Sequence, residues 1–90
     1  MPVYRVMVCG RGLWVAIDDV LQRVTFRVTR FVHAPDAARA RQRALGMVRD
    51  DPRTRPAPGR PTPVLDVEDI APADAVPAVQ PGFAFSPDPE

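Results

Sequence analysis

Apolar and polar residues alternate along the first third of the chain, a pattern typical of β-strands. Residues 2–9 predict a first strand, which the glycines of Gly10-Arg11-Gly12 are expected to end. The short apolar run 13–17 predicts a second strand, closed by a turn at Asp18-Asp19. Residues 23–33 alternate most regularly and predict a third strand. Three strands are therefore expected before any helix.

The two faces of the strand at 23–33 differ in polarity, apart from one residue. Four apolar residues share one face: Val24, Phe26, Val28 and Val32. Arg30 falls on this same face, where an unpaired buried guanidinium would be too costly to keep. It must therefore reach solvent at an edge, pair with a carboxylate or lie at a bulge. We expect a structural ion pair.

One helix is predicted, starting near Pro35 and ending at Asp50-Asp51-Pro52. Proline suits the first helical position, Asp36 complements the positive helix end, and the residue before a proline avoids the helical region. Small and apolar residues recur at three- and four-residue spacing: Ala37, Ala40, Ala44, Met47 and Val48. This stripe predicts that the helix packs against the sheet and exposes its arginines to water.

Prolines dominate the C-terminal half. Five of them between residues 52 and 63 predict a stiff, extended connector. Residues 64–70 alternate again and predict an edge strand with a charged face. After Ala71, five further prolines argue against regular structure, but Phe83 and Phe85 are too apolar for a fully solvated tail. We expect one or both to dock on the body.

These elements predict an α+β protein with the order β-β-β-α-β, a small antiparallel sheet with one helix packed across it. Residues 1–71 form one domain with a proline-rich loop at 52–63, and residues 72–90 form an extended, proline-rich acidic tail that is partly docked. A chain of 90 residues buries only about 60% of its unfolded surface. Because the single cysteine, Cys9, excludes an intramolecular disulfide, we expect a homodimer to supply further burial.

Charge is distributed unevenly along the chain. All 12 basic residues are arginines within residues 1–60, together with five acidic residues, whereas the last thirty residues carry six carboxylates and no base. Two interpretations follow. Either the acidic C-terminal part folds back over the arginine-rich part, or the arginines stay free for an anionic partner.

The chain offers little catalytic chemistry, since it holds one histidine, one cysteine, one serine and one tyrosine. Nucleophilic catalysis needs a nucleophile, a base and an orienting group, but Cys9 and His33 both fall on predicted strands, where a lone cysteine is commonly a core residue. The two supply at most two zinc ligands. Gly10-Arg11-Gly12 lacks the lysine and hydroxyl of a phosphate-binding loop. We therefore expect no catalytic residue, no cofactor and no metal, and a protein that is not an enzyme.

The candidate binding surface combines basic and aromatic side chains: Arg23, Arg27, Arg39, Arg43, Phe83 and Phe85. The arginines could bind successive phosphates of a nucleic-acid backbone. Phe26 and Phe31, however, point to opposite faces and offer no platform on which bases could stack. The expected function is a small non-enzymatic protein-interaction module that self-associates and has a protein partner. The alternatives are a nucleic-acid-binding accessory protein and an inhibitor of a host nuclease encoded by a phage or mobile element.

The N-terminal residues lack the continuous apolar run of a signal peptide, because Arg5 and Arg11 interrupt it. No stretch approaches the roughly 18 apolar residues that cross a bilayer. Together with the free thiol, this predicts a cytoplasmic protein without membrane contact.

Several short motifs together resemble a group of small, functionally uncharacterised proteins from GC-rich bacteria. The motifs are Tyr4-x-Val6-x-Val8-x-Gly10-x-Gly12, Phe26-x-x-Thr29-Arg30-x-Val32-x-Ala34, an alanine-spaced helix running to Val48, and Pro81-Gly82-Phe83. The resemblance covers most of the chain and implies a compact α+β fold without implying an activity. The expected element order is also similar to that of HicB-type antitoxin domains, a likeness of fold alone.

Overall fold

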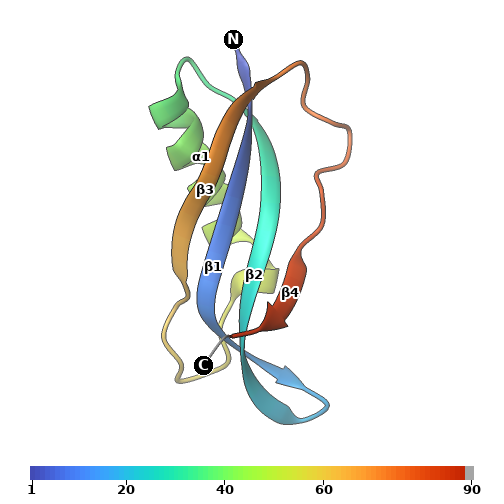
Figure 1. Ribbon diagram of the computed structural model, residues 1–90. Coiled ribbons are helices and arrows are strands. Elements are labelled where there is room, and N and C mark those ends of the chain that lie inside the picture. The colour runs from blue at the N-terminus through green and yellow to red at the C-terminus, as the bar shows by residue number, and fades with distance from the viewer. Residues whose placement is uncertain (89–90) are drawn as a thin grey trace.

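The computed structural model describes residues 1–88 and consists of one antiparallel sheet with a helix on one face (Figure 1). Its elements are β1 (Val3–Ile17), β2 (Val20–His33), α1 (Ala37–Asp50), the short 3-10 helix η1 (Pro52–Thr54), β3 (Val64–Ala73) and β4 (Ala84–Pro87). The strand order across the sheet is β3-β1-β2-β4. The α+β class is confirmed, but two strands and not three precede the helix.

β1 is one long strand because its glycines form a bulge. The pairing of β1 with β2 shifts between Gly10 and Leu13, and Gly12 has a positive φ of 75°. Gly10 lies under the ring of Phe26, where an added Cβ would overlap the ring. The prediction that these glycines end a strand was therefore wrong, since they let the strand bend and continue.

β1 and β2 join through the predicted turn at Asp18 and Asp19, whose φ values are 52° and 62°. Ile17 pairs with Val20, so the loop has two residues, and both take the left-handed conformation that a type I′ hairpin turn requires. The end of this hairpin projects beyond the other strands (Figure 1). Its apolar side chains Ile17, Val20 and Leu21 are exposed.

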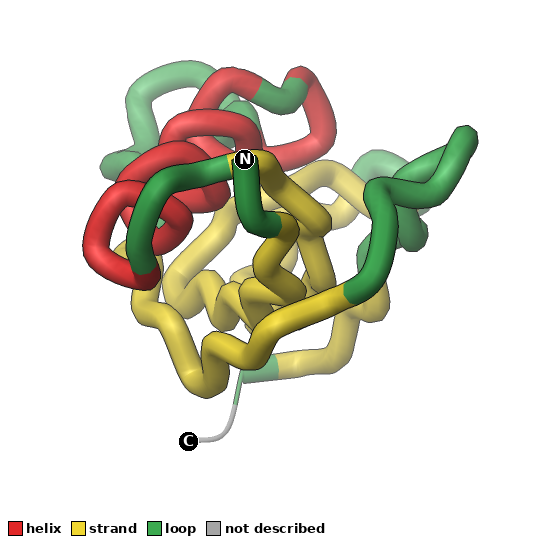
Figure 2. The backbone as a smooth tube through the Cα atoms, turned by 90° about the horizontal axis from the view of Figure 1, so that it is seen from above, coloured by secondary structure: helices red, strands yellow, loops and turns green. Residues whose placement is uncertain are grey.

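The core lies between α1 and the sheet, and Figure 2 shows the helix over one side of the strands. Ala40, Ala44 and Val48 are the buried helix residues, whereas Met47, predicted to share their stripe, is 39% exposed. The Asp36 side chain caps the helix start by accepting a hydrogen bond from the Arg39 backbone N–H.

Both edge strands come from the C-terminal half. β3 confirms the strand predicted at 64–70 and pairs with β1, with a register shift opposite Met7 and Val8. β4 pairs with β2, so the prediction that no regular structure follows Ala71 was wrong. Prolines are tolerated here because β4 is an edge strand whose outward N–H groups need no partner. The last two residues of the predicted tail, 89–90, lie outside the described residues.

Candidate functional site

The C-terminal segment 80–88 lies along the outer edge of β2, in what we call the tail groove: the edge of β2 from Arg23 to Phe31 together with the end of α1 and η1. At one end of the groove, β4 pairs with residues 24–27 of β2. At the other end, the Gln80 amide donates to the Phe31 carbonyl at 2.9 Å and accepts from the Phe31 N–H at 3.0 Å. The glutamine side chain thus replaces a strand residue as partner of β2.

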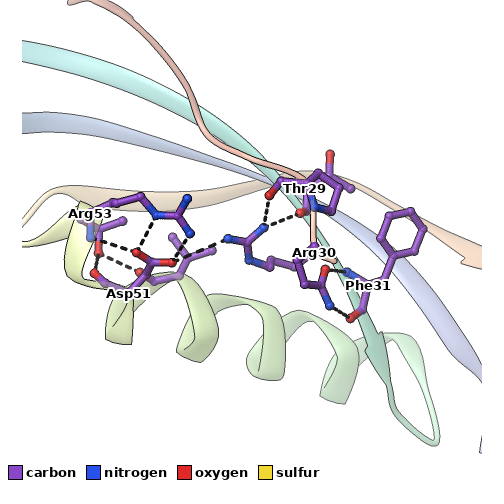
Figure 3. Close-up of polar contacts among 9 residues, drawn as sticks. Thr29, Arg30, Phe31, Asp51 and Arg53 are labelled. Atoms are coloured by element: carbon purple, nitrogen blue, oxygen red, sulfur yellow. Dashed lines mark hydrogen bonds and ion pairs between the residues drawn. The ribbon is translucent and has the colours of Figure 1, made fainter. Parts of the chain in front are cut away.

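Arg30 occupies the centre of the groove (Figure 3). Its guanidinium donates to the Pro81 carbonyl at 2.6 Å and the Thr29 carbonyl at 2.9 Å, and lies 3.7 Å from the Asp51 carboxylate. The side chain is only 4% exposed, and burial lowers the pKa of Arg30 while Asp51 opposes this. The expected ion pair of Arg30 is confirmed, and it ties the end of α1 to the C-terminal segment.

Arg53 completes this cluster by holding the same carboxylate with two side-chain contacts, at 2.9 and 3.0 Å. These hydrogen bonds are the main reason why the pKa of Asp51 lies below its ordinary value. The Asp51 carboxylate therefore stays charged between two guanidinium groups and fixes both of them beside the C-terminal segment.

Phe83 packs between the two guanidinium groups and two other rings. Its ring centroid lies 4.5 Å from the Arg53 guanidinium carbon and 5.2 Å from that of Arg30. It is also 5.4 Å from the Phe26 ring and 5.8 Å from the Phe85 ring. Phe83 is partly buried, whereas Phe85, which contacts the rings of Phe26 and Phe83, remains 49% exposed. Phe83 is thus the main apolar anchor of the segment.

Asp88 holds the far end of the segment. Its carboxylate lies 2.9 Å from Nε of Arg23 and accepts a hydrogen bond from the Thr25 hydroxyl. Its backbone N–H donates to the Arg23 carbonyl at 3.2 Å. Side chains therefore hold both ends and the middle of the segment, and backbone pairing holds residues 84–88.

Two further C-terminal carboxylates pair with strand arginines on the sheet face opposite the helix. Glu68 lies 2.9 Å from Arg27, and Asp69 lies 3.3 Å from Arg5. Cys9 is paired in register with Arg27, and its thiol is buried. Together with the Asp88–Arg23 pair, these contacts show that carboxylates of the acidic C-terminal part neutralise Arg5, Arg23 and Arg27.

The six predicted binding residues do not form one surface. Arg23 and Arg27 lie on the sheet face opposite the helix, where they pair with Asp88 and Glu68. Phe83 and Phe85 instead pack against Phe26, which faces the helix. The two helix residues lie elsewhere: the Arg39 side chain is exposed, and Arg43 donates to the His33 carbonyl.

Four residues of the tail groove were not predicted as site residues from the sequence: Asp51, Arg53, Gln80 and Asp88. Of these, only the pairing of Arg53 could have been predicted, because Arg53 follows Asp51, the aspartate at the helix end, by two residues. Gln80 and Asp88 stand among prolines, where no periodicity applies.

The remaining candidates for chemistry are dispersed. Among residues 1–88, no group of three histidine, cysteine or acidic side chains could hold a metal ion. A hollow of about 560 Å³ lies between the end of α1 and the start of β3, lined by Arg49, Asp50, Asp51, Thr54, Arg55, Pro56, Thr62, Pro63 and Leu65. Within the described part of the chain, no helix is long and apolar enough to span a bilayer.

Comparison with family models, with curated proteins and with solved structures found no match. The resemblance to the group of small bacterial proteins therefore stays a prediction.

Proposed function

We propose that the protein is a small, non-enzymatic protein-interaction module that holds an extended peptide segment by strand addition at the edge of β2. The supporting observation is the tail groove, in which backbone pairing is combined with side-chain contacts to Gln80, Phe83 and Asp88. Strand addition takes affinity from main-chain hydrogen bonds and specificity from such side-chain contacts. In this structure the chain's own C-terminal segment is the bound peptide.

The partner that suits the groove is the same segment of a second copy. The connection between β3 and the groove, residues 74–79, makes no backbone hydrogen bond outside regular elements among the described residues, and Val79 is 82% exposed. Exchange of an identical element between two copies is a low-cost route to a dimer, because every contact is preserved. We accordingly propose a homodimer in the cytoplasm, where the buried thiol of Cys9 remains reduced.

A labelled peptide of residues 78–88 tests the groove directly. In the native chain the attached segment competes at an effective concentration on the order of 1 mM, so the peptide should bind weakly. The full-length Phe83→Ala variant loses its own anchor, and its segment competes less well by the docking free energy that is lost. We expect it to bind the peptide about 30- to 150-fold more tightly. The milder variant Gln80→Ala serves as a second open form.

The matched control is a peptide in which the phenylalanine at position 83 is replaced by alanine, and it should bind neither form. If both variants are folded by circular dichroism and neither binds the native peptide better than the wild-type chain does, the peptide-binding function is excluded. Light scattering at tens of micromolar separately tests self-association, because a monomer mass would remove the dimer.

A further inference from the structure

Folding converts the charge gradient along the sequence into a difference between layers of the molecule. We call residues 37–63, which comprise α1, η1 and the proline-rich loop, the helix layer. It contains seven arginines and two aspartates, an excess of five positive charges. The rest of the described chain contains five arginines and eight acidic residues, an excess of three negative charges. The positive charge is therefore concentrated on the side of the molecule that carries the helix.

Most arginines of the helix layer have no carboxylate partner among residues 1–88. Arg53 is bound to Asp51, and the other six lie on exposed residues without an ion pair: Arg39, Arg41, Arg43, Arg49, Arg55 and Arg60. Arg43 donates to a backbone carbonyl and Arg60 stacks on Trp14 at 4.2 Å, which leaves Arg39, Arg41, Arg49 and Arg55 for an external ligand. By contrast, Arg5, Arg23 and Arg27 of the sheet are neutralised.

We propose that the helix layer is a second binding site, which takes the phosphate backbone of nucleic acid without reading its base sequence. The 14 residues of α1 extend over about 21 Å, a length along which duplex DNA carries about 12 phosphate charges. Arginines spaced along such a helix can contact several phosphates at once and release their counterions. Asp50, the exposed carboxylate of α1, lies at its C-terminal end and leaves the preceding turns wholly basic.

The composition of the layer favours nucleic acid over an acidic protein. Protein interfaces depend on buried aromatic or apolar anchors at their centre. Met47 is the one large exposed apolar residue among residues 37–63. The nearby indole of Trp14 is covered by Arg60 and offers no platform on which a base could stack. The layer therefore supplies charge without anchors or base readout, which is the requirement for sequence-independent backbone binding.

The test is fluorescence anisotropy of a labelled 20-base-pair DNA duplex titrated with the full-length protein in a salt series. We expect a dissociation constant of about 1–100 μM at physiological salt. The Arg41→Gln, Arg49→Gln double variant should make the slope of log affinity against log salt shallower by about 1.8. The matched control is the Arg5→Gln, Arg27→Gln double variant, which changes net charge equally but on the sheet face and should leave the slope unchanged.

Three results would overturn the proposal. The first is no binding at low salt, and the second is an equal change of slope in both double variants, since that would mean net charge alone attracts the duplex. The third is displacement of the duplex by polyglutamate at equal charge concentration, which would assign the layer to acidic proteins. None of these outcomes depends on the tail groove, so failure here is distinct from failure of the peptide-binding function.

Discussion

Replacing Phe83 by alanine should detach the C-terminal segment while the rest of the fold persists. The phenylalanine ring is the one side chain of the segment that contacts Arg30, Arg53 and Phe26 together. Its removal leaves Gln80, Asp88 and the short β4 ladder to hold nine residues against their conformational entropy.

The loss of stability follows from the contacts of the ring. Burial of most of a phenylalanine side chain is worth about 1.5–2 kcal/mol, and each guanidinium over the ring adds about 0.5–1 kcal/mol. Because the segment can detach locally, the loss cannot exceed its docking free energy. We expect about 2–3 kcal/mol, which for a domain of this size lowers Tm by roughly 10–20 °C.

Thermal unfolding followed by far-ultraviolet circular dichroism measures this loss, and urea titration gives the free energy. Phe85→Ala is the matched control, because this ring is half exposed and has no guanidinium over it among the described contacts. It should cost less than about 1 kcal/mol. A Phe83→Ala chain within about 0.5 kcal/mol of wild type, or a larger loss for Phe85→Ala, would refute the docking energetics.

Two further substitutions test the bulge and the ionic cluster. Gly10→Ala should destabilise the fold by about 1–3 kcal/mol in urea unfolding, because its Cβ would overlap the Phe26 ring, whereas Gly46→Ala, with open space around it in α1, should stabilise by about 0.5–1 kcal/mol; a neutral Gly10→Ala would contradict the packing of this ring. The lowered pKa of Asp51 implies stability that is present above the unfolded-state value near 4 and lost as pH falls through the folded-state value, so wild type should lose more stability than Asp51→Asn between pH 6 and acid conditions. Parallel losses in the two chains would show that Asp51 contributes nothing to the pH dependence.

Periodicity predicted the fold where one face of an element is buried. The strand containing Arg30 and the helix with Ala40 and Ala44 were located correctly because burial imposes a repeat of two or 3.6 residues. The bulge at Gly12 was not, because a glycine that ends a strand and one that bends it look alike in sequence. Which of the two occurs depends on whether the partner strand continues to pair beyond the glycines, as β2 does here.

The candidate site was predicted only in part, for a related reason. The need of Arg30 for a partner follows from the cost of burying a charge. The docking of Phe83 follows from its apolar character. The identity of the partners does not follow from the sequence. Gln80 reaches β2 from 49 residues away, and Asp51 forms ion pairs with arginines on two different elements. Such contacts are set by how the chain closes in three dimensions and leave no local repeat.

The layered distribution of charge gives the molecule a large permanent dipole although its net charge is only +1. Near the isoelectric pH of about 8.0, where net repulsion vanishes, the basic side of one molecule attracts the acidic side of the next. The protein should therefore be retained by both cation and anion exchangers at that pH. Dilute buffer should favour stacks of oriented molecules, and moderate salt, by screening the dipoles, should dissolve them.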